Sequence, residues 1–515
     1  MILVVVGILS DMEPDSWEEV EESLNKGNTS ITNQWIETLE LSYRHLPEPL
    51  KCCFLYCGAF GEDQQIPARK LVWLWIAEEL VVEKDGREHL EDVAEDYLKE
   101  LINRNLVMIA KKGSADRVKT CVLHDLLHNF CILKANEECF LHHLPSHDLG
   151  KSIEPNMIYR LSVHYRKVED LVDSRLIYSR LRSLLLDADF GGGCDDAFYS
   201  KIFQSRLLRV LEMTVARECY VIPTVILPLV HLKYLALRSF STKFIIPPSF
   251  SQLANLETFI FYGFGGVYLE IELPNTLGSM IKLKDLYTRH AQWVLPPDNP
   301  EHLSNLKNLR NLSSVTFSSL QTMTELIRNF ANIRKLKCDL DLDEEQHVNL
   351  EIVRLDFLTQ LESLKFYCGP LDRPFQFPQK LKRLSLLGLE LPWSKISAIH
   401  KLPNLEVLKL QSHSFLGDEW DILEEEETFP NLRFLKLEEL DLRKWMASND
   451  NFPCLKKLVL SWCDKLVELP TCLAESATLE MIEVCRCTVA TESLKQIHEI
   501  KEKYGIENLK ILIVE

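Results

Sequence analysis

Few residues of this 515-residue chain have the types and spacing that catalysis or phosphate binding needs. Gly150-Lys151-Ser152 has the form of the end of a phosphate loop, but the glycine that such a loop requires earlier would fall at Pro145. The sequence has no Gly-x-Ser-x-Gly elbow and no His-Glu-x-x-His zinc motif, and no Ser/His/Asp arrangement can be read from spacing. We therefore interpret Gly150-Lys151-Ser152 as part of a linker, and we expect a protein that is not an enzyme.

His124 and Asp125 are the remaining candidates for chemistry. An imidazole can donate a hydrogen bond to a phosphate oxygen. Aspartate is also a preferred N-cap residue, so the pair could simply cap the helix that follows, with Asp125 as the cap. The residues alone leave both interpretations open.

A leucine motif of the form L-x-x-L-x-L recurs through the rest of the chain from about residue 158. Well-defined copies begin at Leu181, Leu208, Leu232, Leu361 and Leu405, and the intervals between neighbouring copies run from 20 to 30 residues. This is the period of leucine-rich repeats, and it predicts about fourteen units. Residues 309–317 fit either of two registers.

The spacing has a physical reason. Side chains alternate along a strand, so the fourth and sixth positions of the motif point to the same side. One unit cannot bury these leucines alone, so units must stack into a solenoid with a shared core. The sequence therefore predicts a parallel sheet with the leucines on its inner side.

The positions between the leucines should line the concave face, where such solenoids bind partners. These positions mix aromatic and basic side chains, which suits a protein or peptide partner. The candidate partner-binding residues are Tyr234, Arg238, Lys365, Tyr367, Arg383, Lys409, Phe434, Lys436 and Lys457.

The first 150 residues read as helices followed by a hairpin. Periodic apolar residues predict helices at 16–24, from about 31 to 46, at 71–76 and at 88–103. Residues 106–110 and 118–122 flank a polar turn and read as a β-hairpin. Helices followed by a hairpin describe a winged-helix module, so the predicted fold class is α+β: a helical and winged-helix block followed by a leucine-rich-repeat solenoid.

Charge and cysteine content restrict the partners. The net charge is −18, and residues 1–150 carry 14 basic and 27 acidic residues. This acidity argues against nucleic acid as a partner, because a phosphate-binding face needs a basic stripe. The fifteen cysteines are scattered, as in a cytosolic protein, and the sequence has no apolar run long enough for a transmembrane segment.

An ordered set of motifs in the first block carries a family resemblance. The motifs are Leu41-Ser-Tyr43, Cys53-Phe-Leu-Tyr56, Phe60-Gly-Glu-Asp63, Leu74-Trp75, Arg104-Asn-Leu-Val107 and Leu123-His124-Asp125. In this order they closely resemble the winged-helix part of plant nucleotide-binding leucine-rich-repeat immune receptors, and the chain is most similar to the coiled-coil type related to late blight resistance proteins.

The resemblance implies a plant innate-immunity receptor, a disease resistance protein whose repeats sense a pathogen effector or a guarded host protein. The repeats could also contact the nucleotide-binding domain of a receptor. In the family, the histidine matching His124 touches the β-phosphate of ADP, and the residue matching Asp125 steadies that contact. The family's coiled coil and phosphate loop do not occur in this sequence. We therefore expect a chain without the nucleotide-binding core and without a cofactor, although full-length relatives bind ADP or ATP.

Two alternatives stay open: a leucine-rich-repeat substrate adaptor of a ubiquitin ligase, and an inactive receptor fragment. The predicted hairpin favours the receptor, because an adaptor box is purely helical. The expected division is a helical remnant at 1–30, a winged helix at 31–145, a linker with the first repeat at 146–180, and leucine-rich repeats at 181–515. The expected location is cytoplasmic, with peripheral attachment to membranes as a further option.

Overall fold

The structure, a computed structural model, divides into two compact units, residues 1–267 and 268–515, and each unit is considered by itself. It describes residues 39–83, 89–144, 158–165, 180–188, 205–215, 219–264, 269–295, 303, 305–341, 352–371, 373–422, 427–487, 491–503 and 509–514. The predicted helix at 16–24, the remnant at 1–30 and the Gly150-Lys151-Ser152 segment lie outside these residues.

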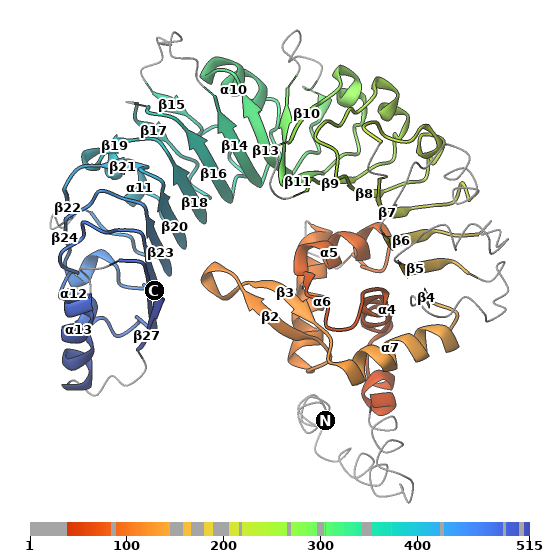
Figure 1. Ribbon diagram of the computed structural model, residues 1–515, viewed down its shortest axis with the longest axis horizontal. Helices are drawn as coiled ribbons and strands as arrows, with labels where there is room; N and C mark the ends of the chain where they lie inside the picture. The colour runs from red at the N-terminus through yellow and green to blue at the C-terminus, as the bar shows by residue number, and fades with distance from the viewer. Residues whose placement is uncertain are drawn as a thin grey trace, which may run out of the picture. The chain divides into compact units, whose positions relative to one another are not determined.

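A winged helix opens the described part of the first unit (Figure 1). The wing is an antiparallel pair, β2 and β3, and a short strand, β1, pairs with the other side of β3. The elements are α4 (Glu48–Tyr56), η2 (Cys57–Ala59), β1 (Ile66–Pro67), α5 (Ala68–Ala77), α6 (Leu90–Asn103), β2 (Met108–Lys112), η3 (Ser114–Asp116), β3 (Val118–Val122) and α7 (Asp125–Glu137). The predicted winged helix is confirmed.

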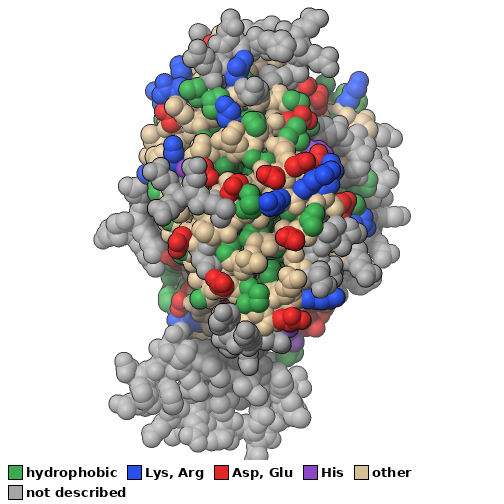
Figure 2. Space-filling model, turned by 90° about the vertical axis from the view of Figure 1, so that its left-hand side faces the viewer, with side chains coloured by type: hydrophobic (Ala, Val, Ile, Leu, Met, Phe, Trp, Pro, Cys, Tyr) green, Lys and Arg blue, Asp and Glu red, His purple; other side chains and the backbone are tan. Residues whose placement is uncertain are grey.

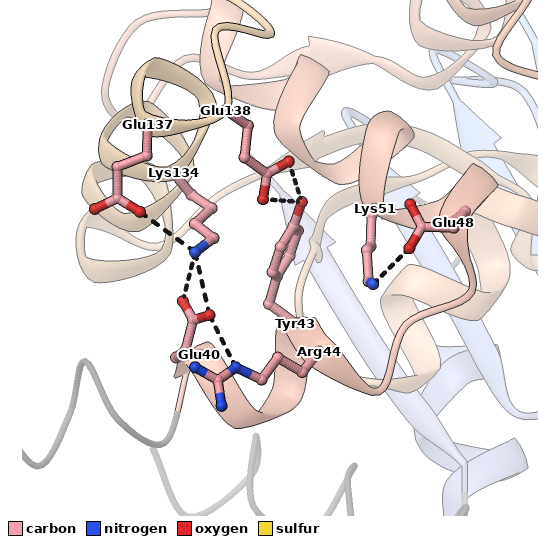
Figure 3. Close-up of polar contacts among 8 residues, drawn as sticks. All are labelled: Glu40, Tyr43, Arg44, Glu48, Lys51, Lys134, Glu137 and Glu138. Carbon is pink, nitrogen blue, oxygen red and sulfur yellow. Dashed lines mark hydrogen bonds and ion pairs between the residues drawn. The ribbon is translucent and has the colours of Figure 1, made fainter.

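Helical residues 39–44 are fastened to α7 by a polar cluster around Tyr43 (Figure 3). The Tyr43 hydroxyl donates to both carboxylate oxygens of Glu138, at 3.0 and 2.9 Å. Lys134 of α7 bonds Glu40 at 3.1 Å. The Tyr43 ring packs against Phe54 and Phe130, which also contact each other. This cluster joins helices that lie far apart in the sequence.

Parallel strands follow in the same unit, in chain order along one sheet. They are β4 (His142–Leu144), β5 (Arg160–Tyr165), β6 (Ser183–Ala188), β7 (Val210–Thr214), β8 (Tyr234–Arg238) and β9 (Thr258–Tyr262). Strand β4 directly follows α7 and already pairs with β5 in parallel, so the sheet begins at His142.

The second unit continues the repeats with β10 (Leu269–Glu272), β11 (Asp285–Arg289), β12 (Ala291–Val294), β13 (Asn311–Phe317), β14 (Lys335–Leu340), β16 (Ser363–Cys368), β18 (Arg383–Leu387), β20 (Val407–Gln411), β23 (Phe434–Glu438), β25 (Lys457–Ser461), β26 (Met481–Cys485) and β27 (Lys510–Val514). Short strand pairs accompany the return arms, namely β15 (Val353–Arg354) with β17 (Phe375–Gln376), β19 (Leu391–Pro392) with β21 (Phe415–Leu416), and β22 (Glu419–Asp421) with β24 (Lys444–Met446). The helices are α10 (Leu320–Ile327), α11 (Ser397–His400), α12 (Cys472–Glu475) and α13 (Thr491–Lys503).

The motif leucines form ladders across this sheet. Leu384, Leu408 and Leu435 are in register on successive strands, and each side chain is 0% exposed. Each repeat thus buries its leucines against those of its neighbours, which is what the period predicts. The leucine-rich-repeat fold is confirmed.

Asparagines in the turns before the strands add a second ladder, which the sequence analysis did not recognise. Asn404 donates its side-chain amide to the Gln379 carbonyl at 2.9 Å, and Asn431 donates to the Pro403 carbonyl at 2.7 Å. Asn255, Asn308 and Asn332 bond earlier turns in the same way. These bonds satisfy turn carbonyls that the strand ladder leaves without a partner.

Strand β13 explains why residues 309–317 fit two registers. Its first residues pair with β11, and its later residues pair with β12. A bulge separates the two halves, and Ser314 lies there with a positive φ of 53°. The two halves of β13 therefore pair with two different strands, and the bulge between them shifts the spacing of the apolar residues.

Candidate functional site

The candidate site is the outer face of the parallel sheet, the face that carries the residues between the motif leucines. In the first unit this face is covered by the winged helix, because α5 packs against β8. The central outer residues Leu185, Ala236 and Ile260 are apolar and buried. The centre of the outer face is therefore buried on β6, β8 and β9, whereas the central outer residue of β7 is the charged Glu212.

Tyr234 corrects the sequence analysis, which expected it to face solvent. The side chain is 0% exposed, and burial raises the pKa of its phenol well above the ordinary value. The reason is tertiary: the strand does point Tyr234 to the outer face, but helix α5 lies against that strand. Tyr234 therefore contributes to domain packing and is not available to a partner.

Ion pairs fix the winged helix to the repeats. Lys70 of α5 bonds Glu212 of β7 at 2.7 Å, and the two side chains are 11% and 13% exposed. Glu78, just after α5, bonds Arg160 of β5 at 2.6 Å. Because such pairs are largely removed from water, they hold specific partners together more than they add stability.

Glu79 extends the contact at the rim of the interface. It accepts hydrogen bonds from Lys233, at 2.7 Å, and from Arg209. These bonds, that from Lys233 first, lower the pKa of the Glu79 carboxyl although its partial burial opposes them.

Three histidines meet at the same junction: His128 of α7, His143 of β4 and His164 of β5. The ring centroids lie 6.0 Å apart for His128 and His143, and 5.0 Å apart for His143 and His164. His128 Nε2 lies 2.7 Å from the Phe60 carbonyl oxygen, and His164 Nε2 lies 3.0 Å from that of Ala59. The cluster therefore ties α7, the turn after α4 and the first repeat to one another.

The pKa values of His143 and His164 shift in opposite directions. Burial first, and then the neighbouring imidazoles, lower the pKa of His143 to about 4. Burial also acts to lower the pKa of His164, but its bonds to Asp187 and the Ala59 carbonyl outweigh burial, and the net shift is upward. Asp187 in turn has its pKa lowered to about 2, chiefly by the bond from His164. His143 is thus a neutral side chain packed beside an ion pair.

Arg238 lies at the edge of this cluster. It bonds Asp187 at 3.1 Å, and its side chain is 43% exposed. The predicted candidate is accessible, and in the described structure it is also engaged in the junction.

The outer face of the second unit is mostly polar and half-buried, unlike the apolar centre of the outer face in the first unit. Lys365, Arg383, Lys409, Lys436 and Lys457 all lie on it, as predicted, and Tyr367 is 48% exposed. Lys436 bonds Glu438, and Lys457 bonds Glu483, each at 2.7 Å. Parallel pairing brings these six residues from five strands onto one face.

Phe434 corrects the sequence analysis a second time. It points to the outer face but is buried, because Val407 and Lys457 are its in-register neighbours and the Lys409 ammonium lies 5.3 Å from its ring centroid. The aromatic ring makes a cation–π contact with Lys409 and is not accessible to a partner protein.

His124 and Asp125 lie exposed at the start of α7. His124 is the N-cap, and its Nδ1 accepts from the Leu126 amide at 3.4 Å. Of the two interpretations left open, the pair does cap the helix, but through His124 and not through Asp125. Asp125 is the first helical residue, where its charge suits the helix dipole. An exposed imidazole at a helix N-terminus fits one contact to a phosphate group.

The sequence analysis missed the winged-helix interface and the histidine cluster. One signal was present: the central outer residue is apolar in three of the first repeats, at Leu185, Ala236 and Ile260, and is a lysine in three of the later ones, at Lys365, Lys409 and Lys436. Apolar residues on both faces of a strand indicate that both faces are covered.

Repeats stacked through leucine ladders, with a winged helix docked on the first of them, define a leucine-rich-repeat protein with a winged-helix module. Family comparisons agree: a leucine-rich repeat region matches residues 190–513, and a disease resistance protein winged helix domain matches residues 59–131. The chain belongs to the leucine-rich-repeat family, and its winged helix is similar to that of disease resistance proteins. Its relatives in sequence are late blight resistance proteins. Both matched domains are of typically non-catalytic kinds.

Two relatives from Solanum demissum illustrate the match. The chain is 34% identical to the putative late blight resistance protein homolog R1B-16 and 34% identical to late blight resistance protein R1-A, in each case over its full length. It spans 40% of the length of each of these relatives.

Two solved structures of leucine-rich-repeat-type proteins match this chain at low identity. A leucine-rich-repeat protein of Leptospira interrogans is 19% identical, with a TM-score of 0.42 over 69% of this chain and 78% of its own. An internalin of Listeria monocytogenes is 12% identical, with a TM-score of 0.40 over 65% of this chain and 81% of its own. Within the described residues, every helix is too short or too polar to span a membrane.

Reversing the charge of Lys70 tests the docking of the winged helix. Lys70→Glu sets two carboxylates against each other in a largely dry interface, where removing one partner of an ion pair costs about 3–5 kcal/mol. We expect amide hydrogen exchange in α5, β7 and β8 to accelerate at least about tenfold, and the double change Lys70→Glu/Glu212→Lys to restore most of the protection. Lys456→Glu, at the more exposed Lys456–Glu480 pair, is the matched control. Unchanged exchange in α5 and β8 would count against this interface.

The pH dependence of stability tests the histidine cluster. Because the pKa of His143 is about 4 in the fold and about 6.5 in an unfolded chain, unfolding takes up a proton between these pH values. The His143 contribution is therefore present above pH 6.5 and is lost as the pH falls, by at most about 1.4 kcal/mol per pH unit.

The raised pKa of His164 has the opposite sign: its contribution is present below pH 6.5 and is lost at higher pH. The measurement is urea unfolding at pH 7.5, 6 and 5, followed by a probe in the first unit. His143→Phe should flatten the acid loss, whereas His231→Phe, at an exposed position, should keep it. Equal acid sensitivity in His143→Phe and the wild type would show that His143 does not titrate as described.

Proposed function

We propose that this chain acts in plant disease resistance, with the later repeats sensing a partner and the first repeats restraining the winged helix. The observation that carries the proposal is the division of the outer face. In the first unit the winged helix packs on the outer face, and Tyr234 is completely buried there. In the second unit the outer face presents basic and aromatic side chains. One sheet thus combines a docking face and a recognition face.

The partner in this proposal is a pathogen effector or a guarded host protein, met in the cytoplasm or at a membrane surface. The family membership supports it, and so does the β-hairpin wing, which a purely helical ligase-adaptor box would not contain. The nucleotide-binding domain of a receptor is a further partner, because full-length relatives extend well beyond the part that this chain matches.

Genetic disruption tests the proposed role. Plants in which this coding sequence is disrupted should support more growth of at least one isolate in a pathogen panel, and the intact sequence should restore resistance. A coding sequence carrying Leu408→Ala, which opens a cavity in the leucine ladder and costs roughly 2–5 kcal/mol, should fail to restore it. Equal pathogen growth across the whole panel in disrupted and intact plants would refute the proposal.

We also propose that the 515-residue chain by itself does not bind ADP tightly. His124 supplies one contact, and one hydrogen bond to a charged group contributes roughly 1.5–3 kcal/mol. A dissociation constant of 1 μM requires about 8 kcal/mol. Calorimetric titration with ADP and magnesium should therefore show no micromolar binding. Micromolar binding that disappears in His124→Ala would prove this proposal wrong.

A further inference from the structure

Four lysines form a row across the outer face of the second unit. Lys337, Lys365, Lys409 and Lys436 occupy the central position of β14, β16, β20 and β23, and Ser385 of β18 lies between the second and the third. Each is in register with the next along the row. Neighbouring strands are about 4.8 Å apart, so this lysine row extends over roughly 20 Å.

The charge of this surface is opposite to that of the whole chain. The first, third and fifth residues of these five strands include six basic and two acidic side chains, whereas the chain carries a net charge of −18. The acidic residues are Asp339 and Glu438, both at the carboxyl ends of their strands. Figure 2 faces the left-hand side of Figure 1, where β22 and β24 lie, and shows acidic, basic and hydrophobic side chains intermixed there, without one dominant charge.

Like charges on neighbouring strands repel each other, so the row lowers the stability of the isolated sheet. Lys337 donates to Ser314 at 2.6 Å, and Lys436 bonds Glu438. Lys365 lies half-buried between them, and burial first, and then Lys337, lower the pKa of its ammonium group. A negatively charged partner would relieve the repulsion that the fold leaves within the row.

We propose that the lysine row binds an extended, acidic segment of a partner protein. This inference rests on the proposed function, because it names the chemistry of the partner that the later repeats sense. Alternate residues of an extended peptide point the same way about 6.8 Å apart, within reach of long lysine side chains in a row. Tyr367, 48% exposed beside Lys365 on β16, offers an apolar contact at the edge of the row.

The row fits carboxylates better than a dense polyphosphate. Phosphate recognition favours the two-pronged guanidinium of arginine, whereas this row consists of lysines, and Arg383 of β18 stands at the first position of its strand and not in the row. The acidic chain as a whole would also repel a duplex nucleic acid.

Binding of a labelled peptide to the full chain tests the proposal. The probe is a twelve-residue peptide of alternating glutamate and apolar residues, followed by fluorescence anisotropy, with a twin in which glutamine replaces every glutamate. The row variant is Lys365→Gln/Lys409→Gln/Lys436→Gln. Its matched control is Lys380→Gln/Lys401→Gln/Lys444→Gln, which makes the same charge change at exposed lysines outside the row.

We expect the row variant to weaken binding of the acidic peptide at least about tenfold, and the control to change it less than about twofold. Ser385→Lys, which completes the row, should tighten binding, and this gain cannot come from misfolding. The glutamine twin should bind weakly to every variant. Equal losses in the two triple variants, or equally tight row-dependent binding of inorganic tripolyphosphate or duplex DNA, would overturn the proposal.

The two proposals can fail separately. If the acidic peptide does not bind but the row variant abolishes resistance in the complemented plants, the acidic partner is wrong and the receptor role stands. If the peptide binds as expected but disrupted plants keep full resistance, the lysine row is a real binding site and the proposed function is wrong.

Discussion

Alternation along a parallel strand is the constraint on which this protein depends. Each repeat places its leucines on one face, and in-register stacking, as for Leu384, Leu408 and Leu435, buries them against the neighbouring repeats. Because the buried leucines, the strand ladder and the asparagine bonds hold the stack together without the outer side chains, the residues on the outer face are free to differ from repeat to repeat. The two units use this freedom in opposite ways.

In the first unit the outer face became an intramolecular interface. Leu185, Ala236 and Ile260 are buried there, and Tyr234 lies in strand β8, against which α5 packs. Apolar contacts supply most of the driving force of such an interface, whereas the ion pairs mainly select its geometry, because a desolvated pair gains little net energy. The Lys70–Glu212 pair and the Glu78–Arg160 pair link the winged helix to two different strands and so fix its orientation on the repeats.

In the second unit the outer face stayed polar, and its charge opposes that of the chain. Lysines in register repel each other, and alternating acidic and basic residues at these positions would make the sheet more stable. The cost is limited by contacts within the face, such as the Lys436–Glu438 bond and the packing of Lys409 over Phe434. A surface that retains such repulsion is suited to a partner of opposite charge, and electrostatic attraction would also speed the encounter.

The sequence by itself determined the repeats, the winged helix and, in the well-defined repeats, the direction in which the strand residues point. Local periodicity is enough for this, because the leucine spacing of Leu405 and Leu408 and the alternation along β20 and β23 are short-range properties. The same reasoning placed Lys365, Lys409 and Lys436 on the outer face correctly, because the direction of a side chain follows from the alternation along its own strand and not from the elements packed around it.

Only the tertiary structure decided what covers each outer position. Tyr234 and Phe434 stand at the same position of their strands, and both were expected to face solvent, yet helix α5 packs against the strand of one and neighbouring side chains cover the other. The histidine cluster likewise joins His128, His143 and His164 from three elements whose meeting no local pattern records. Contacts between segments far apart in the chain depend on how whole domains pack, and spacing within one segment carries no information about its distant neighbours.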